Sequence, residues 1–289
     1  MRNNTEEQAQ LLVEALPYIQ KYYGKTVVIK YGGNAMINEE IKALVIRDIL
    51  LLSLVCMRPI LVHGGGPDIN KMMDKVGLVP EFVDGKRVTD SKTMEIVEMV
   101  LAGKTNKRIV GLLNSLGGNA VGLSGKDGSL INASQLSDRL GRVGRVDNIN
   151  PKVLFDLMDN GYIPVISSIG MGDEGESYNI NADHIAGEIA AAVQAEKLIM
   201  MTDVDGIFLD MKDPDTFISS LDTKKAAELI KSGAVSKGMI PKVEACIIAL
   251  EGGVKGTHII NGTKPHSILM EVLTDRGIGT MIEKDAANE

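Results

Sequence analysis

Two lysines lie beside glycine-rich turns in this chain of 289 residues, and both are placed to meet an anion. Lys30 ends an apolar run just before Gly32 and Gly33, and Lys242 lies four residues after Gly238. Because glycine has no Cβ, the backbone N–H groups of such turns can close around phosphate or carboxylate oxygens. A neighbouring lysine adds a full positive charge. The pattern predicts a site for highly charged anions.

Two more glycine-rich turns follow apolar runs, one at residues 63–67 and one at residues 122–126, which ends in Lys126. The first of these is equally explained as a tight strand-to-helix turn without a ligand. Lys242 is expected at the start of a helix, where a cation opposes the helix dipole and a bound phosphate would relieve that conflict. For either lysine, the alternative is an ordinary solvated surface charge.

A carboxylate and a guanidinium are the other candidate groups. Asp183 and Asn179 belong to the run 179–183 before an alanine-rich helix, so capping of that helix by Asn181 or Asp183 is one interpretation. The other places Asp183 between the two lysines, where it holds their ammonium groups. Arg87 lies in a loop and can bind a carboxylate with its planar fork.

Known phosphate-binding fingerprints do not fit. A Walker A loop ending at Gly103 and Lys104 would need glycine where Glu98 stands. A dinucleotide fingerprint beginning at Gly64 would need glycine where Ile69 stands.

Composition excludes several classes of protein. The net charge of −7 argues against a general nucleic-acid or membrane-surface binder, and the absence of Trp argues against a base-stacking platform. The four histidines have no metal-ligand spacing, so no metal site is predicted. No apolar run reaches membrane-spanning length, and no signal-peptide core precedes residue 24. Cys56 and Cys246 are expected to be buried thiols in the cytoplasm.

The apolar pattern predicts alternating strands and helices, hence an α/β fold built on an open, mainly parallel sheet. The expected strands are residues 26–31, 59–63, 120–123, 163–167, 197–202 and 257–260, with 142–148 in a hairpin and 279–282 as a last edge strand. The expected helices are residues 39–57, 68–76, 93–102, 107–116, 152–158, 183–194, 224–231 and 242–251. In such sheets ligands bind at the carboxyl ends of strands, where the glycine-rich turns lie.

We divide the chain into an N-terminal helix at 1–24, an N-lobe at 25–194 and a C-lobe at 195–289. The N-terminal helix is marked by Leu12, Leu16 and Ile19 at helical spacing and ends at Gly24. It packs on its own lobe in one interpretation and forms an oligomer contact in the other.

These residues together resemble the amino acid kinase family. The resemblance extends from Thr26 to Ile282 and includes all four glycine-rich turns. Its remaining motifs are residues 85–89, 179–183 and 202–206. It implies an αβα sandwich of two lobes, an N-lobe that binds an acyl amino acid and a C-lobe that binds ATP. It also implies transfer of the γ-phosphoryl group to a carboxylate, with Mg²⁺ carried by the nucleotide.

Roles carry over from the family position by position. Lys30 and Lys242 resemble the pair that neutralises the transferring phosphoryl group, and Asp183 resembles the organiser of that pair. Substrate-binding positions correspond to Gly65, Gly66, Arg87 and Asn179. Nucleotide-binding positions correspond to Gly32, Gly33, Thr202, Asp203, Gly206, Lys237, Gly238 and Met239. Lys237 is a departure, because relatives commonly carry glycine there, and it leaves the shape of the ATP loop open.

The resemblance is closest to the branch that phosphorylates the side chain of N-acetyl-L-glutamate, the second step of arginine synthesis by the acetylated route. The N-terminal helix and residues 271–280 resemble the arginine-inhibited, hexameric members of that branch. Glu271 and Gly277 are the candidate effector residues. The chain is therefore expected to form a homo-oligomer, either a dimer or a hexamer, with arginine as a possible effector and a nitrogen-signalling protein as a possible partner.

Three other functions stay open. A sibling kinase would act on another acid, such as glutamate, aspartate, carbamate or an acetylated aminoadipate. A regulatory protein would bind ATP without forming an acyl phosphate. A dinucleotide oxidoreductase would bind a nicotinamide cofactor, against the failed fingerprint.

Overall fold

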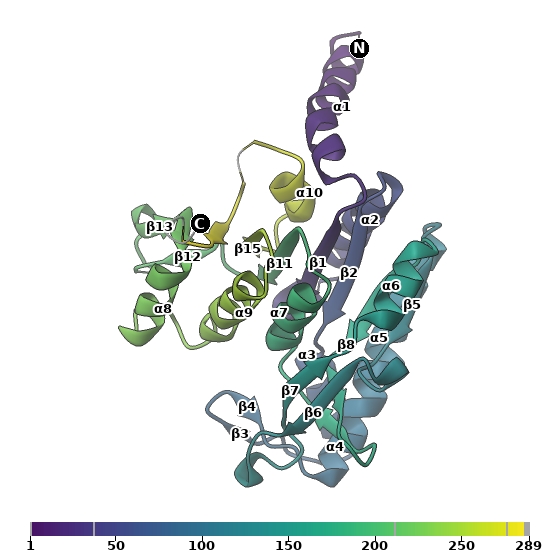
Figure 1. Ribbon diagram of the computed structural model, residues 1–289, viewed down its shortest axis with the longest axis vertical. Coiled ribbons are helices and arrows are strands. Elements are labelled where there is room, and N and C mark those ends of the chain that lie inside the picture. Colours follow the sequence, from purple (N-terminus) through teal and green to yellow (C-terminus); the bar gives the residue numbers. More distant parts are fainter. Residues whose placement is uncertain (1, 37, 211, 276, 286–289) are drawn as a thin grey trace.

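The computed structural model describes residues 2–36, 38–210, 212–275 and 277–285. Its centre is an eight-stranded sheet in the order β14-β16-β15-β11-β1-β2-β8-β5 (Figure 1). Neighbouring strands are parallel except β15 and β16. The strands are β1 (Thr26–Tyr31), β2 (Arg58–His63), β5 (Ala120–Leu123), β8 (Ile163–Ser167), β11 (Lys197–Thr202), β14 (Ser220–Asp222), β15 (Gly256–Asn261) and β16 (Thr280–Glu283). The mainly parallel sheet is as predicted.

Helices cover both faces of this sheet, which makes the αβα sandwich expected from the sequence. One face packs against α2 (Glu39–Leu54), α5 (Asn106–Ser115) and α10 (Ser267–Val272). The other packs against α6 (Lys152–Asp159), α7 (Ala182–Ala192), α8 (Thr223–Lys231) and α9 (Ile240–Glu251). Both hydrophobic clusters are continuous along the sheet, because parallel strands buried on two sides carry apolar residues at nearly every position.

Side-chain alternation along β1 decides which face its lysine occupies. Val27 and Ile29 pack on the α2 side, whereas Val28 packs on the α7 side. Successive strand residues point to opposite faces, so Lys30 shares the α7 side with Val28. β1 also lies between β2 and β11, which is the point where the strand order reverses direction. Ligands of open α/β sheets bind at such a point.

A second layer of structure lies beyond the carboxyl ends of these strands, at the bottom of Figure 1. It contains α3 (Gly66–Lys75), α4 (Ser91–Glu98) and the π-helix η2 (Met99–Thr105), which runs directly into α5. The sequence predicted two separate helices here, and the π-helix joins them. A small four-stranded sheet in the order β10-β9-β6-β7 completes the layer, with β6 (Ile131–Gln135), β7 (Gly144–Ile149), β9 (Ile169–Met171) and β10 (Ser177–Asn179).

Several short strands and 3-10 helices lie outside the two larger sheets. They are the hairpin strands β3 (Phe82–Val83), β4 (Lys86–Arg87), β12 (Ile207–Phe208) and β13 (Phe217–Ile218), and the 3-10 helices η1 (Gly33–Met36), η3 (Asp127–Ser129), η4 (Asp138–Leu140) and η5 (Pro214–Thr216).

Two sequence predictions are wrong. The final strand, β16, is not at the edge, because β14 pairs with it on the outer side. β14 has only three residues and no apolar run to announce it. Cys56 is exposed, because it lies in the turn after α2 with a φ of 64°. Cys246 is buried as expected, and both thiols are free.

The N-terminal helix α1 (Arg2–Tyr22) projects away from the sheet (Figure 1). Tyr22, at its end, is buried, but four apolar side chains along it are exposed. These are Leu11, Leu12, Val13 and Leu16. Tyr18 and Tyr22 thus pack on the sheet's hydrophobic cluster, whereas these four side chains do not. Among the described residues, no helix is both long and apolar enough to span a membrane.

Candidate active site

Two lysines from opposite halves of the chain converge on one carboxylate. Lys30, near the end of β1, places its Nζ 2.7 Å from Oδ1 of Asp183. Lys242, in the first turn of α9, places its Nζ 3.1 Å from Oδ2 of the same residue. Asp183 lies in the first turn of α7. Asn181 caps this helix, because its Oδ1 accepts from the backbone N–H of Asp183 at 2.7 Å. Asp183 therefore bridges the two cations, as one of the two interpretations predicts, while Asn181 does the capping.

The electrostatics favour an ionised Asp183. Burial by itself would raise the pKa of this carboxyl, but the two ammonium groups outweigh it and hold the pKa below its ordinary value. Side-chain exposure is 8% for Lys30 and 14% for Lys242, so each cation is largely withdrawn from water. Two cations sharing one anion leave a net positive charge of one, which suits a site that must receive phosphate oxygens.

Glycine backbone surrounds this charge cluster. A Cβ on Gly32 would lie 3.0 Å from Nζ of Lys30, so a side chain there would crowd the ammonium group. Gly33, with a φ of +64°, adopts a conformation that favours glycine. On the other side, the carbonyl of Gly238 accepts from Nζ of Lys242 at 3.3 Å. Two of the predicted glycine-rich turns thus meet at the cluster.

A cavity of about 540 Å³ adjoins the cluster. It is lined by Ala182, the neighbour of Asp183, and by Gly64, whose Cβ position would lie 3.6 Å from the Ala182 side chain. The four predicted substrate-binding residues all line it, and these are Gly65, Gly66, Arg87 and Asn179. Residues distant in sequence are thereby brought to one concave surface.

Arg87 is held at the wall of the cavity by its neighbours. Its Nη2 donates to Oδ1 of Asn70 at 2.6 Å, and its guanidinium lies 4.8 Å from the ring centre of Phe82. Burial lowers the pKa of the guanidinium. Thr89 connects Arg87 to Asn179, because its hydroxyl donates to the Arg87 carbonyl at 2.9 Å and accepts from Asn179 Nδ2 at 3.2 Å.

Apart from Gly32 and Gly33, the predicted nucleotide-binding residues lie in the C-terminal half. Thr202 ends β11 and donates to Oδ1 of Asp203 at 3.3 Å. Gly206 has a φ of +151°, and a Cβ there would lie 2.5 Å from Oγ1 of Thr280. Lys237 is exposed, and Met239 is buried at the start of α9. Among these residues, Gly238 contacts the charge cluster directly, because its carbonyl accepts from Nζ of Lys242.

The two candidate effector residues lie together, away from the charge cluster. A Cβ on Gly277 would lie 2.8 Å from Oε1 of Glu271. His258 Nδ1 lies 2.6 Å from the same oxygen, and its Nε2 lies 2.8 Å from Nζ of Lys197. Lys197 begins β11 and Thr202 ends it, so this group sits roughly 16 Å from the nucleotide-binding end of the strand.

The turn at residues 122–126 has a packing role. Gly125 donates its N–H to the Ile169 carbonyl at 2.9 Å, and a Cβ there would lie 2.2 Å from that oxygen. Lys126 is paired with Glu98 at 3.5 Å and donates to Ser177 at 3.1 Å. Its charge is therefore engaged within the second layer.

Sequence reasoning missed several residues that shape the site. Asn70 and Thr89 hold Arg87, and Lys197 and His258 accompany Glu271. Asn70 stands one residue after a buried position of α3, and nothing in its neighbourhood marks it. For His258, the only available signal was a polar residue within a buried strand.

Known proteins match this chain over nearly its full length. Residues 25–261 match the model of the amino acid kinase family. The chain is 55% identical over 287 residues to an acetylglutamate kinase of Moorella thermoacetica, covering 96% of this chain and 97% of that protein. It is 56% identical over 283 residues to an acetylglutamate kinase of Trichormus variabilis, covering 98% and 95%.

Solved structures share the same frame. The N-acetylglutamate synthase of Neisseria gonorrhoeae, complexed with coenzyme A and N-acetyl-glutamate, superposes with a TM-score of 0.84 at 27% identity. That match covers 96% of this chain and 64% of the synthase. The carbamate kinase of Giardia lamblia bound to AMP-PNP superposes with a TM-score of 0.67 at 20% identity, covering 91% of this chain and 99% of that one, which reflects a common fold.

Proposed function

This chain belongs to the amino acid kinase family, and from that premise we propose the reaction that it catalyses. It transfers the γ-phosphoryl group of ATP to the side-chain carboxylate of N-acetyl-L-glutamate, giving N-acetyl-L-glutamyl 5-phosphate and ADP. The reaction is the second step of arginine synthesis. The observation that carries this assignment is the pair of lysines on Asp183 at the edge of a cavity lined by Arg87 and Asn179.

The chemistry requires two anions to approach one another. A carboxylate is already ionised at neutral pH, so it needs no general base to become a nucleophile. Phosphoryl transfer depends on positioning and on neutralising the charge of the transferred group. Lys30 and Lys242 supply that charge from two sides, and Asp183 keeps their ammonium groups from separating.

The cavity provides the acceptor half of the reaction. We assign the α-carboxylate of the substrate to Arg87, because its fork is oriented by Asn70. Asn179 binds the backbone part, and the N–H groups of Gly65 and Gly66 bind carboxylate oxygens at the start of α3. This arrangement leaves the side-chain carboxylate at the Gly64–Ala182 edge, next to the lysines.

The nucleotide approaches from the C-terminal half. We place its phosphates between Gly32, Gly33 and the start of α9, and its remaining part near Thr202, Asp203, Gly206 and residues 237–239. Mg²⁺ would arrive with ATP, would keep mostly phosphate and water ligands and would offset part of the phosphate charge. Asp183 is already paired with two lysines, so its carboxylate is engaged by them.

The division into an N-lobe at 25–194 and a C-lobe at 195–289 stays part of this proposal. We place the reaction in the cytoplasm, in keeping with two free thiols. Binding of a nitrogen-signalling protein stays a prediction.

We further propose that arginine inhibits the enzyme at Glu271. The carboxylate pairs with His258, and burial alone would raise its pKa, but that pairing keeps the pKa below the ordinary value. Lys197 lies 5.4 Å from the ring centre of Tyr22, the last residue of α1. Because 4% of the Glu271 side chain is exposed, a guanidinium reaches it only when Gly277 and Ile278, which lie against its carboxylate, shift. The exposed apolar face of α1 makes a homo-oligomer contact in the same proposal.

Hydroxylamine trapping tests the reaction. The protein is incubated with MgATP, hydroxylamine and one acid at a time from a panel of N-acetyl-L-glutamate, glutamate, aspartate and N-acetyl-aminoadipate. We expect hydroxamate and ADP with N-acetyl-L-glutamate above all others. Preference for another acid would assign a sibling kinase, and ATP binding without any hydroxamate would assign a regulatory protein.

A further inference from the structure

A fully buried pair of polar side chains lies beneath the glycine-rich turn of the substrate cavity. His63 ends β2 and Asn106 begins α5, and neither is exposed to solvent. Nδ2 of Asn106 lies 3.1 Å from Nε2 of His63 and donates to the Val165 carbonyl at 2.8 Å. His63 Nδ1 lies 2.9 Å from the carbonyl oxygen of Gly64. The proposed reaction uses neither side chain directly.

The surroundings decide which nitrogen of His63 carries the proton. The Asn106 amide must turn its NH₂ group toward the Val165 carbonyl, because its own oxygen would be repelled there. The same NH₂ group also lies 3.4 Å from the Leu123 carbonyl and 3.1 Å from Nε2 of His63. Because an amide NH₂ nitrogen does not accept, Nε2 has to be the acceptor in its contact with Asn106. The proton therefore resides on Nδ1 and is donated to the Gly64 carbonyl. Burial lowers the pKa of His63 to about 4, so the ring is neutral at physiological pH and keeps this tautomer.

Fixing the Gly64 carbonyl also fixes the next N–H group. The peptide unit is planar and trans, so its C=O and N–H bonds point in opposite directions. The unit whose carbonyl belongs to Gly64 has its N–H on Gly65. With the carbonyl held by the buried ring of His63, the Gly65 N–H points away from that ring. Gly65 is the N-cap of α3, and the first N–H groups of a helix have no acceptor within it.

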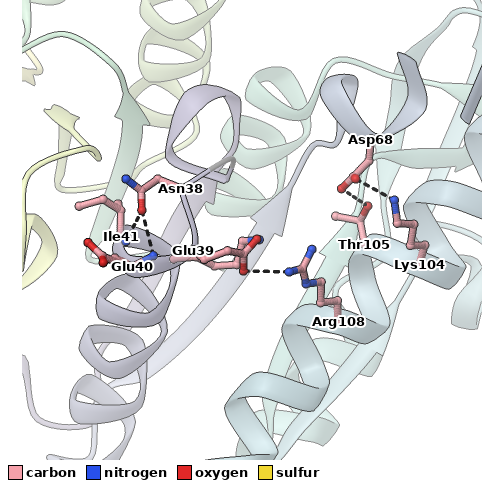
Figure 2. Close-up of polar contacts among 9 residues, drawn as sticks. Asn38, Glu39, Glu40, Ile41, Asp68, Lys104, Thr105 and Arg108 are labelled. Atoms are coloured by element: carbon pink, nitrogen blue, oxygen red, sulfur yellow. Dashed lines mark hydrogen bonds and ion pairs between the residues drawn. The ribbon is translucent and has the colours of Figure 1, made fainter. Parts of the chain in front are cut away.

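The π-helix supplies the other wall of this arrangement. A Cβ on Gly65 would lie 2.6 Å from Cδ2 of the buried Leu101 and 3.4 Å from Oγ1 of Thr105. Thr105 and Lys104 both bind Asp68 in the first turn of α3. Three residues after Thr105, in α5, Arg108 binds Glu39 at the start of α2 (Figure 2). Residues 104–108 thus contact the helices that follow two of the glycine-rich turns, those at residues 32–33 and 63–67.

Space for Asn106 is made by another glycine. A Cβ on Gly122 would lie 1.8 Å from Oδ1 of Asn106, a contact that no side chain permits. Asn106 Oδ1 is itself buried, without a hydrogen-bond partner among the described residues. A buried, unsatisfied amide oxygen costs stability, and the contacts of the Asn106 NH₂ group with His63 and the Val165 carbonyl offset that cost.

We propose that His63 and Asn106 are positioning residues that aim the Gly65 N–H at the bound acyl amino acid. Asn106 orients the imidazole, the imidazole holds the Gly64 carbonyl, and the peptide unit transmits that orientation to the cavity. The inference rests on the proposed function for the identity of the substrate, while the hydrogen-bond relay itself does not.

Two substitutions of His63 separate the links of the relay. In His63→Asn the amide nitrogen can replace Nδ1 and still donate to Gly64, although the bond to Asn106 is lost. In His63→Gln the amide oxygen can replace Nε2 and accept from Asn106, while the donor to Gly64 is lost. We expect His63→Gln to lower kcat/KM for N-acetyl-L-glutamate by about 10²-fold, as a displaced substrate contact does, with little change in the KM for ATP. His63→Asn keeps most of the activity.

A matched asparagine on the same helix provides the control. Asn114 also bridges backbone groups, accepting from the Ala120 N–H at 2.6 Å and donating to its carbonyl at 3.2 Å, away from the cavity. Asn106→Ala should raise the KM for the acyl amino acid, whereas Asn114→Ala should only lower the melting temperature. Equal losses in His63→Asn and His63→Gln, or parallel kinetics in the two asparagine variants, would contradict the relay.

Nitrogen NMR on histidine-labelled protein tests the relay without any turnover. We expect the wild-type His63 ring to be neutral and protonated on Nδ1 between pH 6 and 8. In Asn106→Ala, a mixture of tautomers should appear. A wild-type ring protonated on Nε2 would overturn the inference even if the kinase activity were confirmed. Conversely, a protein whose His63 is protonated on Nδ1 but which does not phosphorylate N-acetyl-L-glutamate would show that the proposed substrate is wrong. The hydrogen-bond relay would then still hold.

Discussion

Lys30 and Asp183 form a buried ion pair, with Nζ 2.7 Å from Oδ1 and less than a tenth of either side chain exposed. One residue comes from the end of the central strand and the other from the first turn of the helix that crosses above it. Because Asp183 also binds Lys242, the carboxylate holds two cations at the place where the cavity ends.

Removing either lysine should reduce turnover far more than binding. In Lys30→Met and Lys242→Met we expect kcat to fall by about 10²-fold or more, because each loses roughly 3 kcal/mol of transition-state stabilisation. The KM for N-acetyl-L-glutamate should change little, since Arg87 is untouched. Steady-state kinetics check this, with Lys225→Met as control because Lys225 forms only an exposed pair with Glu228. A kcat near that of the wild type in both lysine variants would contradict the assignment.

Asp183→Asn should lower both activity and stability. Two ammonium groups would then face each other without a counter-charge, and breaking a buried ion network costs about 3 kcal/mol or more. Added ATP should restore part of the melting temperature, because its phosphates replace the missing charge. Asp159→Asn removes one partner of the exposed pair with Arg58 and should alter neither property. A fully active Asp183→Asn protein is incompatible with the proposed role.

Stability should depend on pH through His63. Its pKa is about 4 in the folded protein and 6.5 when unperturbed, so the unfolded chain binds a proton that the folded protein excludes. The free energy of unfolding is therefore highest above pH 6.5 and falls by about 3 kcal/mol as the pH drops to 4. Urea unfolding of wild type and His63→Asn at several pH values measures this. The difference between the two proteins should shrink on acidification, and a constant difference would exclude a neutral buried ring.

Arginine inhibition should depend on residues distant from the reaction. Glu271→Gln and His258→Gln should raise the arginine concentration needed for half-inhibition by at least about 10-fold, because a charged hydrogen bond or its support is lost. Activity without arginine should stay within about two-fold of wild type. Inhibition curves with arginine give the result. Unchanged inhibition in Glu271→Gln would remove this residue from the effector site.

Deletion of residues 1–24 should reduce the oligomer. The exposed apolar side chains of α1 are then gone, and we expect a hexamer to become a dimer that still turns over substrate. Light scattering coupled to size-exclusion chromatography determines the mass. The double variant Leu11→Glu and Leu12→Glu tests the same surface with the chain intact. A truncated protein that remains hexameric would refute this role of α1.

The fold was largely predictable because most residues of β1, β8 and β11 are buried and apolar. β1, β5, β8 and β11 have the bounds expected from their apolar runs. The second-layer strands were missed because β6, β9 and β10 carry asparagine, serine and glycine in three to five residues. Their burial comes from tertiary packing, which local composition does not record.

The candidate site was predictable only where the type of a residue and its neighbours indicated a chemical role. Lysine beside two glycines is an unusual strand ending, and it drew attention to Lys30. Asn106 gave no comparable signal, since an asparagine among helical residues is ordinarily exposed. Its complete burial depends on the π-helix that precedes it, and no simple spacing rule announces a π-helix.

The most direct test of the account is a crystal structure with N-acetyl-L-glutamate and a non-hydrolysable ATP analogue bound together. We predict the Nζ atoms of Lys30 and Lys242 within hydrogen-bonding distance, about 3 Å, of oxygens on or beside the γ-phosphate. The substrate's side-chain carboxylate should face that phosphorus in line. Ammonium groups directed to bulk solvent, with the two ligands apart, would contradict the central claim.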